Sequence, residues 1–298
     1  MKLQPAAGFL VLLTLLGAQK GRERATEDIL FEVGNINRMD VTISTSLGSL
    51  TLSPNPDTNQ IAGKIYYHPA LVTPRIEYDT MGSRGELDIR AEHGSEFDFD
   101  EEYSFPKGLE GRWKDLEGKK YHSELDLRLP PGIPMNMNLK LGLGEADLDL
   151  TRLTISDLQL ECGLSDVDIS MESANTVRSR TLTIETGLGE LTARHLGNLK
   201  AKTIRVEVGL GSADLDLSGD EIEDTIGRIE VGLGSLNLIL PRRANIRLEI
   251  DKSFLSSVDV DDLTQEGDVW VSDRWEPDRP TLDLEISVSL GSVDVDVK

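Results

Sequence analysis

The stretch Glu207-Val-Gly-Leu-Gly-Ser-Ala-Asp-Leu-Asp-Leu217 decides the fold, because variants of it recur along the chain. The other copies are Thr45–Leu52, Leu141–Leu150, Glu161–Met171, Glu185–Ala193, Glu230–Leu240 and Ser287–Val297. Their central leucines are Leu47, Leu143, Leu164, Leu188, Leu210, Leu233 and Leu290. From Leu143 to Leu233 the copies are 21, 24, 22 and 23 residues apart, a period typical of repeat architectures.

Apolar and polar residues alternate on both sides of each central leucine. Counted from that leucine, apolar or small residues occupy positions −4 and −2, as Val206 and Val208 do, and then positions +3 and +5, as Leu236 and Leu238 do. A period of two indicates a strand on each side. The odd interval between the two sets requires a bulge or corner, for which glycine supplies the backbone freedom. We predict a strand, a glycine corner and a second strand, with the central leucine pointing inward.

One such unit cannot bury its own apolar face, whereas units stacked about 4.8 Å apart bury a continuous column. We therefore predict an all-β fold, a β-solenoid stack of 21–24-residue strand–glycine corner–strand repeats. An ordinary antiparallel sandwich is the alternative, and the near-constant spacing favours the solenoid. If the leucines point inward, Leu210→Asp or Leu233→Asp buries an unpaired charge and destabilises the fold severely.

The amino terminus has the pattern of a secretory signal over residues 1–18. Lys2 is its only charge, the apolar run Phe9–Leu16 is too short to span a bilayer comfortably, and Gly17 and Ala18 offer a cleavage site. We expect export to the periplasm, cell surface or extracellular space. No other segment is long and apolar enough to predict a transmembrane helix.

The remaining chain divides into three predicted ranges. Residues 19–27 are a flexible linker, 28–134 an N-terminal β region and 135–298 the β-repeat region, and the two β regions can form one continuous domain. The closing strand pair, Leu282–Val297, is predicted to cap the stack. Residues 92–122 are the least regular part and are interpreted either as a functional surface excursion or as a poorly ordered acidic insertion.

The formal net charge of −22, from 53 acidic and 31 basic residues, argues against nonspecific nucleic-acid binding. An acidic surface suits cations or basic partners, or serves solubility alone.

The single cysteine, Cys162, excludes an intramolecular disulfide. Because Cys162 occupies position −2 of its copy, we predict a buried core thiol rather than a nucleophile or metal ligand.

Carboxylates recur at two outward positions of the repeat. Position −3 carries Glu161, Glu185, Glu207 and Glu230, and position +4 carries Asp147, Asp168, Asp214 and Asp294. If the copies stack in register, like charges lie one strand spacing apart, which is unfavourable. Bound divalent cations or a basic partner would relieve the repulsion, and so would solvation, salt and interleaved bases such as Lys200, Lys202 and Arg205. These eight carboxylates are the candidate cation-facing residues, and no other cofactor is predicted.

No catalytic constellation emerges from the sequence. His68, His93, His122 and His195 are scattered without metal-ligand spacing, and no nucleophile elbow, phosphate loop or dinucleotide fingerprint is present. We predict a non-catalytic protein. The alternative class is a protein that binds or cleaves envelope polysaccharide, for which some pair of carboxylates would have to serve.

Three motifs carry a family resemblance. The stretches Glu185-Thr-Gly-Leu-Gly-Glu-Leu191 and Glu207-Val-Gly-Leu-Gly-Ser212, with Leu129-Pro-Pro-Gly-Ile-Pro134 before them, resemble the bacterial putative-adhesin and LiaF-like envelope family. The resemblance covers Ile29–Lys298. It implies the toast-rack β fold and a non-enzymatic domain outside a membrane, linked in some members to envelope-stress signalling. We expect its partner to be an envelope protein, a surface glycan or another copy of the same fold.

Overall fold

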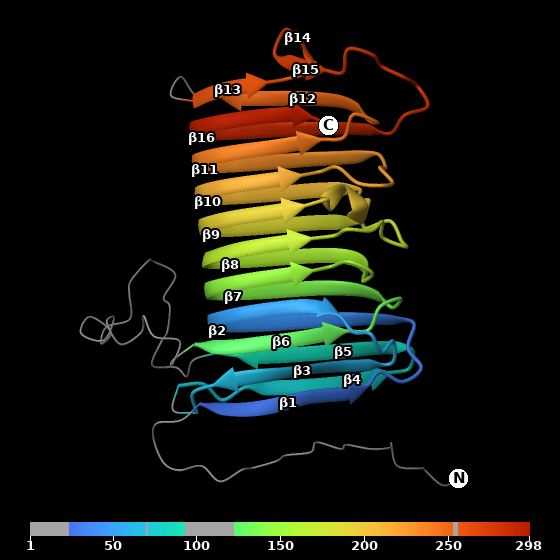
Figure 1. Ribbon diagram of the computed structural model, residues 1–298, viewed down its shortest axis with the longest axis vertical. Coiled ribbons are helices and arrows are strands. Elements are labelled where there is room, and N and C mark those ends of the chain that lie inside the picture. The colour runs from blue at the N-terminus through green and yellow to red at the C-terminus, as the bar shows by residue number, and fades with distance from the viewer. Residues whose placement is uncertain (1–23, 70, 93–121, 253–255) are drawn as a thin grey trace, which may run out of the picture.

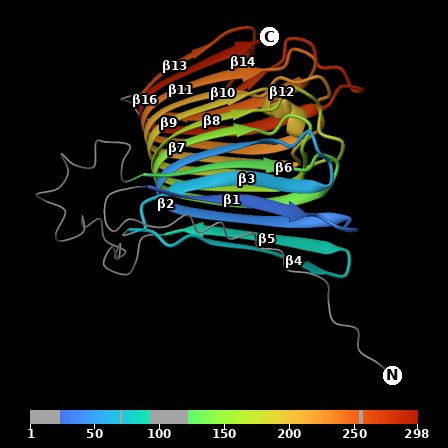
Figure 2. The same cartoon turned by 60° about the horizontal axis from the view of Figure 1, so that its bottom comes forward.

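Each copy of the repeat forms one long, bent strand in the computed structural model, which describes residues 24–69, 71–92, 122–252 and 256–298. The half of each strand before the central leucine lies in a first layer, and the half after it lies in a second layer (Figures 1 and 2). These repeat strands are β2 (Arg38–Pro54), β7 (Pro134–Asp149), β8 (Thr154–Ser170), β9 (Thr181–Arg194), β10 (Thr203–Asp216), β11 (Thr225–Leu240) and β16 (Thr281–Val297).

The shorter elements complete the two ends and the loops of the stack. They are β1 (Ala25–Glu32), β3 (Gln60–Tyr67), β4 (Arg75–Met81), β5 (Arg84–Ala91), β6 (Ser123–Leu129), β12 (Asn245–Lys252), β13 (Ser256–Val260), β14 (Thr264–Glu266), β15 (Val269–Val271) and the 3-10 helix η2 (Leu196–Leu199).

The repeat strands pair in parallel and in register. Leu210 pairs with Leu188 on one side and with Leu233 on the other. The order β2-β7-β8-β9-β10-β11-β16 lies within one 16-stranded sheet that folds over at each bend. The predicted solenoid is therefore confirmed, and the antiparallel sandwich is excluded for the repeats.

The core lies between the two layers, where the predicted inward positions meet. In β10, Val206 and Val208 before the bend and Ala213 and Leu215 after it are each at most 2% exposed. The same positions in the neighbouring rungs are buried, so the rungs share one apolar column. The reversal of inside and outside across the bend is confirmed.

The predicted inward direction of the central leucines was wrong. Leu164, Leu188, Leu210, Leu233 and Leu290 are 40–44% exposed, and Leu47 and Leu143 are half-buried. The reason is the sharpness of the turn: a residue at the tip of a U-shaped bend points away from both layers. The bends form one long edge of the stack, which we call the bent edge, and the leucines lie along it.

A glycine follows the central leucine at the bend of six of the seven repeat strands. Gly48, Gly144, Gly189, Gly211, Gly234 and Gly291 have φ between 140° and 150°. A Cβ added to Gly211 would lie 1.8 Å from the carbonyl oxygen of Gly189, so no other residue fits this close approach. Ser165 takes this place in β8, and the pairing of β8 with β9 lapses between Leu164 and Val167.

Both ends of the stack depart from sequence order. The first half of β2 pairs with β5 and the second half with β6, so β5 and β6 together form one rung beyond β2. At the other end β12 and β13 form one rung beyond β16 in the same way. The prediction that Leu282–Val297 caps the stack was wrong, because this segment is β16 and lies between β11 and the β12–β13 rung.

Antiparallel strands end the parallel stacking. β1 pairs with β3, β4 with β5, and β14 with β15, all antiparallel. β1 begins at Ala25, inside the predicted linker 19–27, so the strand starts earlier than expected. β2 of the N-terminal β region pairs with β7 of the repeat region, which places both in one stack. The predicted signal segment 1–18 and most of the predicted excursion (93–121) lie outside the described residues.

Core and bend leucines are expected to differ in their contribution to stability. Leu215→Ala removes a side chain that is 1% exposed, and we expect the free energy of unfolding to fall by about 2–5 kcal/mol. Leu210→Ala, at a position that is 40% exposed, should cost less than about 1.5 kcal/mol. Urea unfolding followed by circular dichroism measures both. If the two variants lose equal free energy of unfolding, or Leu210→Ala loses more, the result would support the inward orientation of Leu210 instead.

The bend glycine is expected to tolerate no side chain. Gly211→Ala places a Cβ against the backbone of the rung below, so we expect a loss of more than about 4 kcal/mol or failure to fold. The matched control is Gly132→Ala, also at positive φ but with no atom within 4 Å of the added Cβ, and it should cost only about 1–2 kcal/mol. Thermal melting of both variants tests the close approach, which is refuted if the two melt alike.

Candidate functional site

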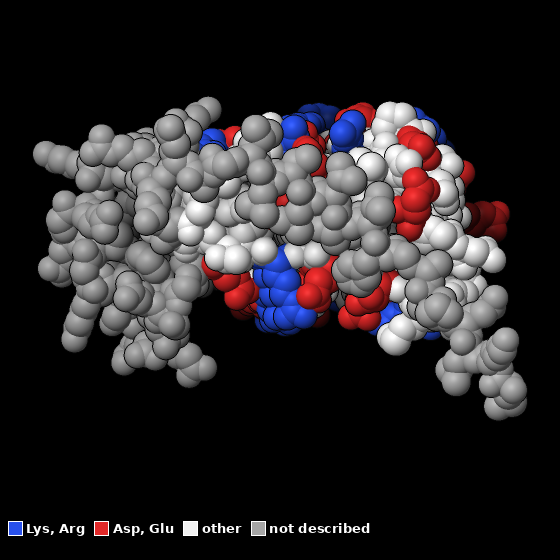
Figure 3. Space-filling model, turned by 90° about the horizontal axis from the view of Figure 1, so that it is seen from below, with Lys and Arg blue, Asp and Glu red and all other residues white. Residues whose placement is uncertain are grey.

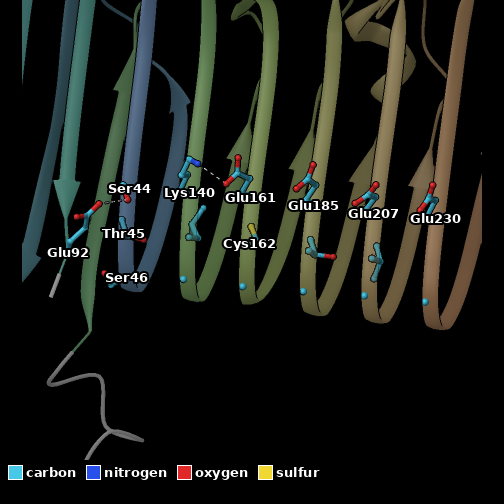
Figure 4. Close-up of a pocket in the computed structure, with 18 residues that line it drawn as sticks. Ser44, Thr45, Ser46, Glu92, Lys140, Glu161, Cys162, Glu185, Glu207 and Glu230 are labelled. Atoms are coloured by element: carbon cyan, nitrogen blue, oxygen red, sulfur yellow. Dashed lines mark hydrogen bonds and ion pairs between the residues drawn. The ribbon is translucent and has the colours of Figure 1, made fainter. Parts of the chain in front are cut away.

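An open groove of about 710 Å³ runs across successive rungs beside the bent edge (Figure 4). It exists because the residue before the central leucine is glycine in these rungs, so no side chain fills the space. Its lining includes Gly142, Gly163, Gly187, Gly209 and Gly232 of β7 to β11. A Cβ at Gly209 would lie 2.5 Å from the carbonyl oxygen of Gly187, so these glycines are also packed against one another.

Four predicted carboxylates form one wall of the groove. Glu161, Glu185, Glu207 and Glu230, which we call the glutamate row, are paired neighbours in β8, β9, β10 and β11. Figure 4 shows them in one row, continued by Lys140 of β7. Neighbouring strands are about 4.8 Å apart, so the stacking places like charges side by side, an arrangement that destabilises a sheet.

Cations within the same layer compensate three of the four glutamates. Lys140 Nζ lies 2.7 Å from Glu161 Oε2. Arg205 pairs with Glu207 and Arg228 with Glu230, in each case two residues away on the same strand. Such partly exposed pairs contribute only about 0.2–1 kcal/mol each.

Glu185 is the exception in the glutamate row. Within the described part of the chain its carboxylate forms no ion pair, because Thr183 stands where β10 and β11 carry an arginine. Of the other bases expected to interleave, Lys200 lies 2.9 Å from Glu221, away from the groove. The row therefore keeps an uncompensated negative charge at its centre.

The predicted aspartates do not form a corresponding row. Asp147 and Asp168 are paired neighbours, but Thr192 separates Asp168 from Asp214. Asn237 then separates Asp214 from Asp294 and donates a hydrogen bond to Asp214. Position +4 faces outward on the second layer and position −3 on the first, so the eight candidate residues do not belong to one site.

The described charged side chains are spread along the stack. In residues 24–69, 71–92, 122–252 and 256–298, no group of three or more His, Cys, Asp or Glu side chains is placed to hold one ion. Seen along the stack, acidic and basic side chains occur on both broad faces (Figure 3). The glutamate row therefore offers successive single contacts rather than a coordination sphere.

Cys162 is buried at position −2 beneath the groove, which confirms its predicted place in the core. Burial, and secondarily the charge of Glu161, raise the pKa of the Cys162 thiol to about 12. The thiol is therefore protonated at neutral pH, and nucleophilic attack, which requires the thiolate, is disfavoured.

The histidines that the structure describes, His68, His122 and His195, are not gathered at one place. His195 has φ of 55° just before η2, and its Nδ1 lies 3.2 Å from Glu172 Oε2. It borders a separate hollow of about 320 Å³ that also includes Arg242 and Lys298. His68 is buried in the loop between β3 and β4, His122 directly precedes β6, and His93 lies outside the described residues.

Sequence analysis missed a set of buried asparagines that hold the loops opposite the bent edge. Asn175 Nδ2 donates to the Ile155 carbonyl at 2.6 Å, Asn198 Nδ2 to that of Met171 at 2.8 Å, and Asn245 Nδ2 to that of Glu276 at 2.8 Å. Asn175 and Asn198 are 23 residues apart, one repeat length, and this spacing was the signal that could have found them. Their role is to satisfy loop backbone groups.

The geometry defines a class: a β-solenoid whose surface consists of rows of repeated side chains rather than an enclosed reaction site. The family model described as the N-terminal domain of toast_rack, DUF2154, matches residues 19–194. This is more than half of the 298 residues, and the chain belongs to that toast-rack family. The parts of the chain that the structure describes hold no helix with the length and hydrophobicity needed to span a bilayer.

Comparison with solved structures finds distant likenesses. A putative cell adhesion protein from Clostridium sporogenes ATCC 15579 is 18% identical, with 93% of this chain and 100% of that chain covered and a TM-score of 0.47. A putative adhesin from Bacteroides fragilis NCTC 9343 is 13% identical, with 94% and 100% covered and a TM-score of 0.32. At these values the likenesses carry no argument about function. Comparison with curated proteins gives no match.

Removing the uncompensated charge is expected to stabilise the fold. Glu185→Gln relieves repulsion from Glu161 and Glu207, and we expect the free energy of unfolding to rise by about 0.2–1 kcal/mol at low salt. The matched control is Glu161→Gln, which also loses the ion pair with Lys140 and should give no gain. Urea unfolding at 20 mM and at 1 M NaCl should show the Glu185→Gln gain shrinking with salt. If Glu185→Gln raises the free energy of unfolding equally at both salt concentrations, or lowers it, the electrostatic account is contradicted.

Proposed function

We propose that this protein is an exported, non-catalytic interaction module of the bacterial cell envelope. The observation that carries the proposal is the form of its surface: in-register rungs present rows of charged and apolar side chains around an open groove. A stacked repeat of this kind offers an extended contact surface to a partner. Membership of the toast-rack family and the signal-like sequence of residues 1–18 support the assignment.

The chemistry of the groove supports binding rather than catalysis. Cys162 is the one thiol, and burial, which raises its pKa to about 12, disfavours the thiolate that nucleophilic attack requires. The glutamates of the groove wall are available for contact with a partner, because Glu161, Glu207 and Glu230 keep about a third of their side chains exposed even in their ion pairs. A link to envelope-stress signalling would then run through a membrane-protein partner.

Polysaccharide binding or cleavage is the second candidate, and one observation favours it. Successive glutamates follow the strand spacing of about 4.8 Å, near the roughly 5 Å separation of carboxylates in retaining glycosidases. Among the residues that the structure describes, however, no aromatic side chain lines the groove to stack against a sugar ring. Interaction with a protein is the better-supported function.

Export and partner capture test the proposal together. We expect the tagged full chain, expressed in the cells that make it, to leave the cytoplasm and to lose residues 1–18, as read by fractionation and N-terminal sequencing. Crosslinking in intact cells followed by mass spectrometry should then enrich one envelope protein. A cytoplasmic protein that retains Met1, or release of reducing sugar from envelope polysaccharide by the purified chain, would overturn the proposal.

A further inference from the structure

The bent edge carries an unusual row of exposed apolar side chains. Leu164, Leu188, Leu210, Leu233 and Leu290, which we call the leucine row, belong to five successive strands and pair in register. Each is 40–44% exposed, although the rungs have a well-filled core. Contiguous apolar surface of this kind marks interaction sites in soluble proteins.

The leucine row borders the groove along most of its length. Leu164, Leu188, Leu210 and Leu233 each follow directly after a glycine that lines the groove. The glutamate row runs parallel to the leucine row, three residues earlier in each rung. The groove is thus lined by the glutamate row, and the leucine row lies next to its glycines at the bent edge. Glu185 contributes a charge that no cation of the described chain balances.

The spacing of the two rows fits an α-helix. The rungs repeat every 4.8 Å or so, and a helix advances about 5.4 Å per turn. Over the three intervals from Glu161 to Glu230 the difference amounts to roughly 2 Å, which flexible lysine side chains can absorb. A helix lying along the groove would therefore present one cation per turn to the glutamate row and one apolar residue per turn to the leucine row.

We propose that the groove and the leucine row bind an amphipathic helix of a partner protein, with a basic stripe beside an apolar stripe. The proposal rests on the interaction function proposed above and specifies its surface and partner. Helix-in-groove binding commonly combines these two stripes.

Other occupants fit this surface less well. A second copy would bring its own glutamate row against the first, and the chain carries a net charge of −22. An anionic membrane surface would repel the glutamates that accompany the leucines. A glycan would find no aromatic side chain among the described residues that line the groove. A basic helix neutralises the glutamates and covers the leucines at the same time.

Peptide binding to the full chain tests the proposal. The probe is a fluorescein-labelled 16-residue helical peptide with a lysine at every turn beside a stripe of leucines, and its control has the same composition with the order scrambled. Fluorescence anisotropy at 50 and 150 mM NaCl gives the Kd. We expect the amphipathic peptide to bind at least about tenfold more tightly than the scrambled peptide, an affinity difference that salt reduces.

Paired variants locate the binding surface. Glu185→Gln with Glu207→Gln, and separately Leu188→Ser with Leu210→Ser, should each raise the Kd at least about tenfold. The matched control is Asp214→Asn with Asp294→Asn, which removes two charges from the second layer and should change the Kd less than about twofold. Thermal melts confirm folding, and the glutamate pair tests the groove independently if the leucine pair unfolds.

Several outcomes overturn the proposal. These are equal binding of the scrambled peptide, an equal loss in the second-layer variant, or binding of a chitosan oligosaccharide or an anionic lipid vesicle without binding of the peptide. If in-cell crosslinking still captures an envelope protein while the peptide fails, the groove assignment falls and the proposed function stands. If export fails while the peptide binds as expected, the groove assignment stands and the proposed envelope function falls.

Discussion

The close approach of one bend to the next is the constraint on which the structure depends. At Gly211 and Gly234 the position of a Cβ lies 1.8 and 1.6 Å from the carbonyl oxygen of the glycine below. Only glycine permits this contact, which recurs at the bends of six of the seven repeat strands and favours parallel, in-register stacking. Once the register is fixed, equal positions of every copy stack into rows. The apolar rows make the core, and the rows that face outward make the surface.

The same constraint creates the features that support function. A bend this sharp turns its central leucine outward, and the glycine before that leucine leaves the groove empty of side chains. The register then aligns Glu161, Glu185, Glu207 and Glu230 at a spacing that repulsion disfavours. Arg205, Arg228 and Lys140 offset much of the repulsion from within the same layer. The negative charge of Glu185 remains uncompensated and lies near exposed leucines. This combination favours a partner that is both basic and apolar.

The sequence predicted the repeat, the all-β solenoid, the buried positions on both sides of the bend and the core thiol of Cys162. The prediction was wrong for Leu210 and the other central leucines. The period-two alternation of a strand assigns each residue to one of two faces, whereas a residue at the tip of a bend points to neither face. The prediction also misplaced β16 because strand order at the ends depends on long-range pairing. For the site, the glutamates were correctly expected to stack, but the aspartate row was interrupted by Thr192 and Asn237, which matter only when the register is known.

The proposed binding surface depends on the outward direction of the central leucines. The solvent accessibility of cysteines introduced at these positions measures that direction most directly. In a Cys162→Ala background, single cysteines at Leu210 and at Leu215 would be labelled with a maleimide in the native state. The account predicts rapid labelling at position 210 and almost none at position 215 until the protein is unfolded in urea, since these leucines are 40% and 1% exposed. Protection at position 210 with labelling at position 215 would contradict both the outward leucine row and the binding surface built on it.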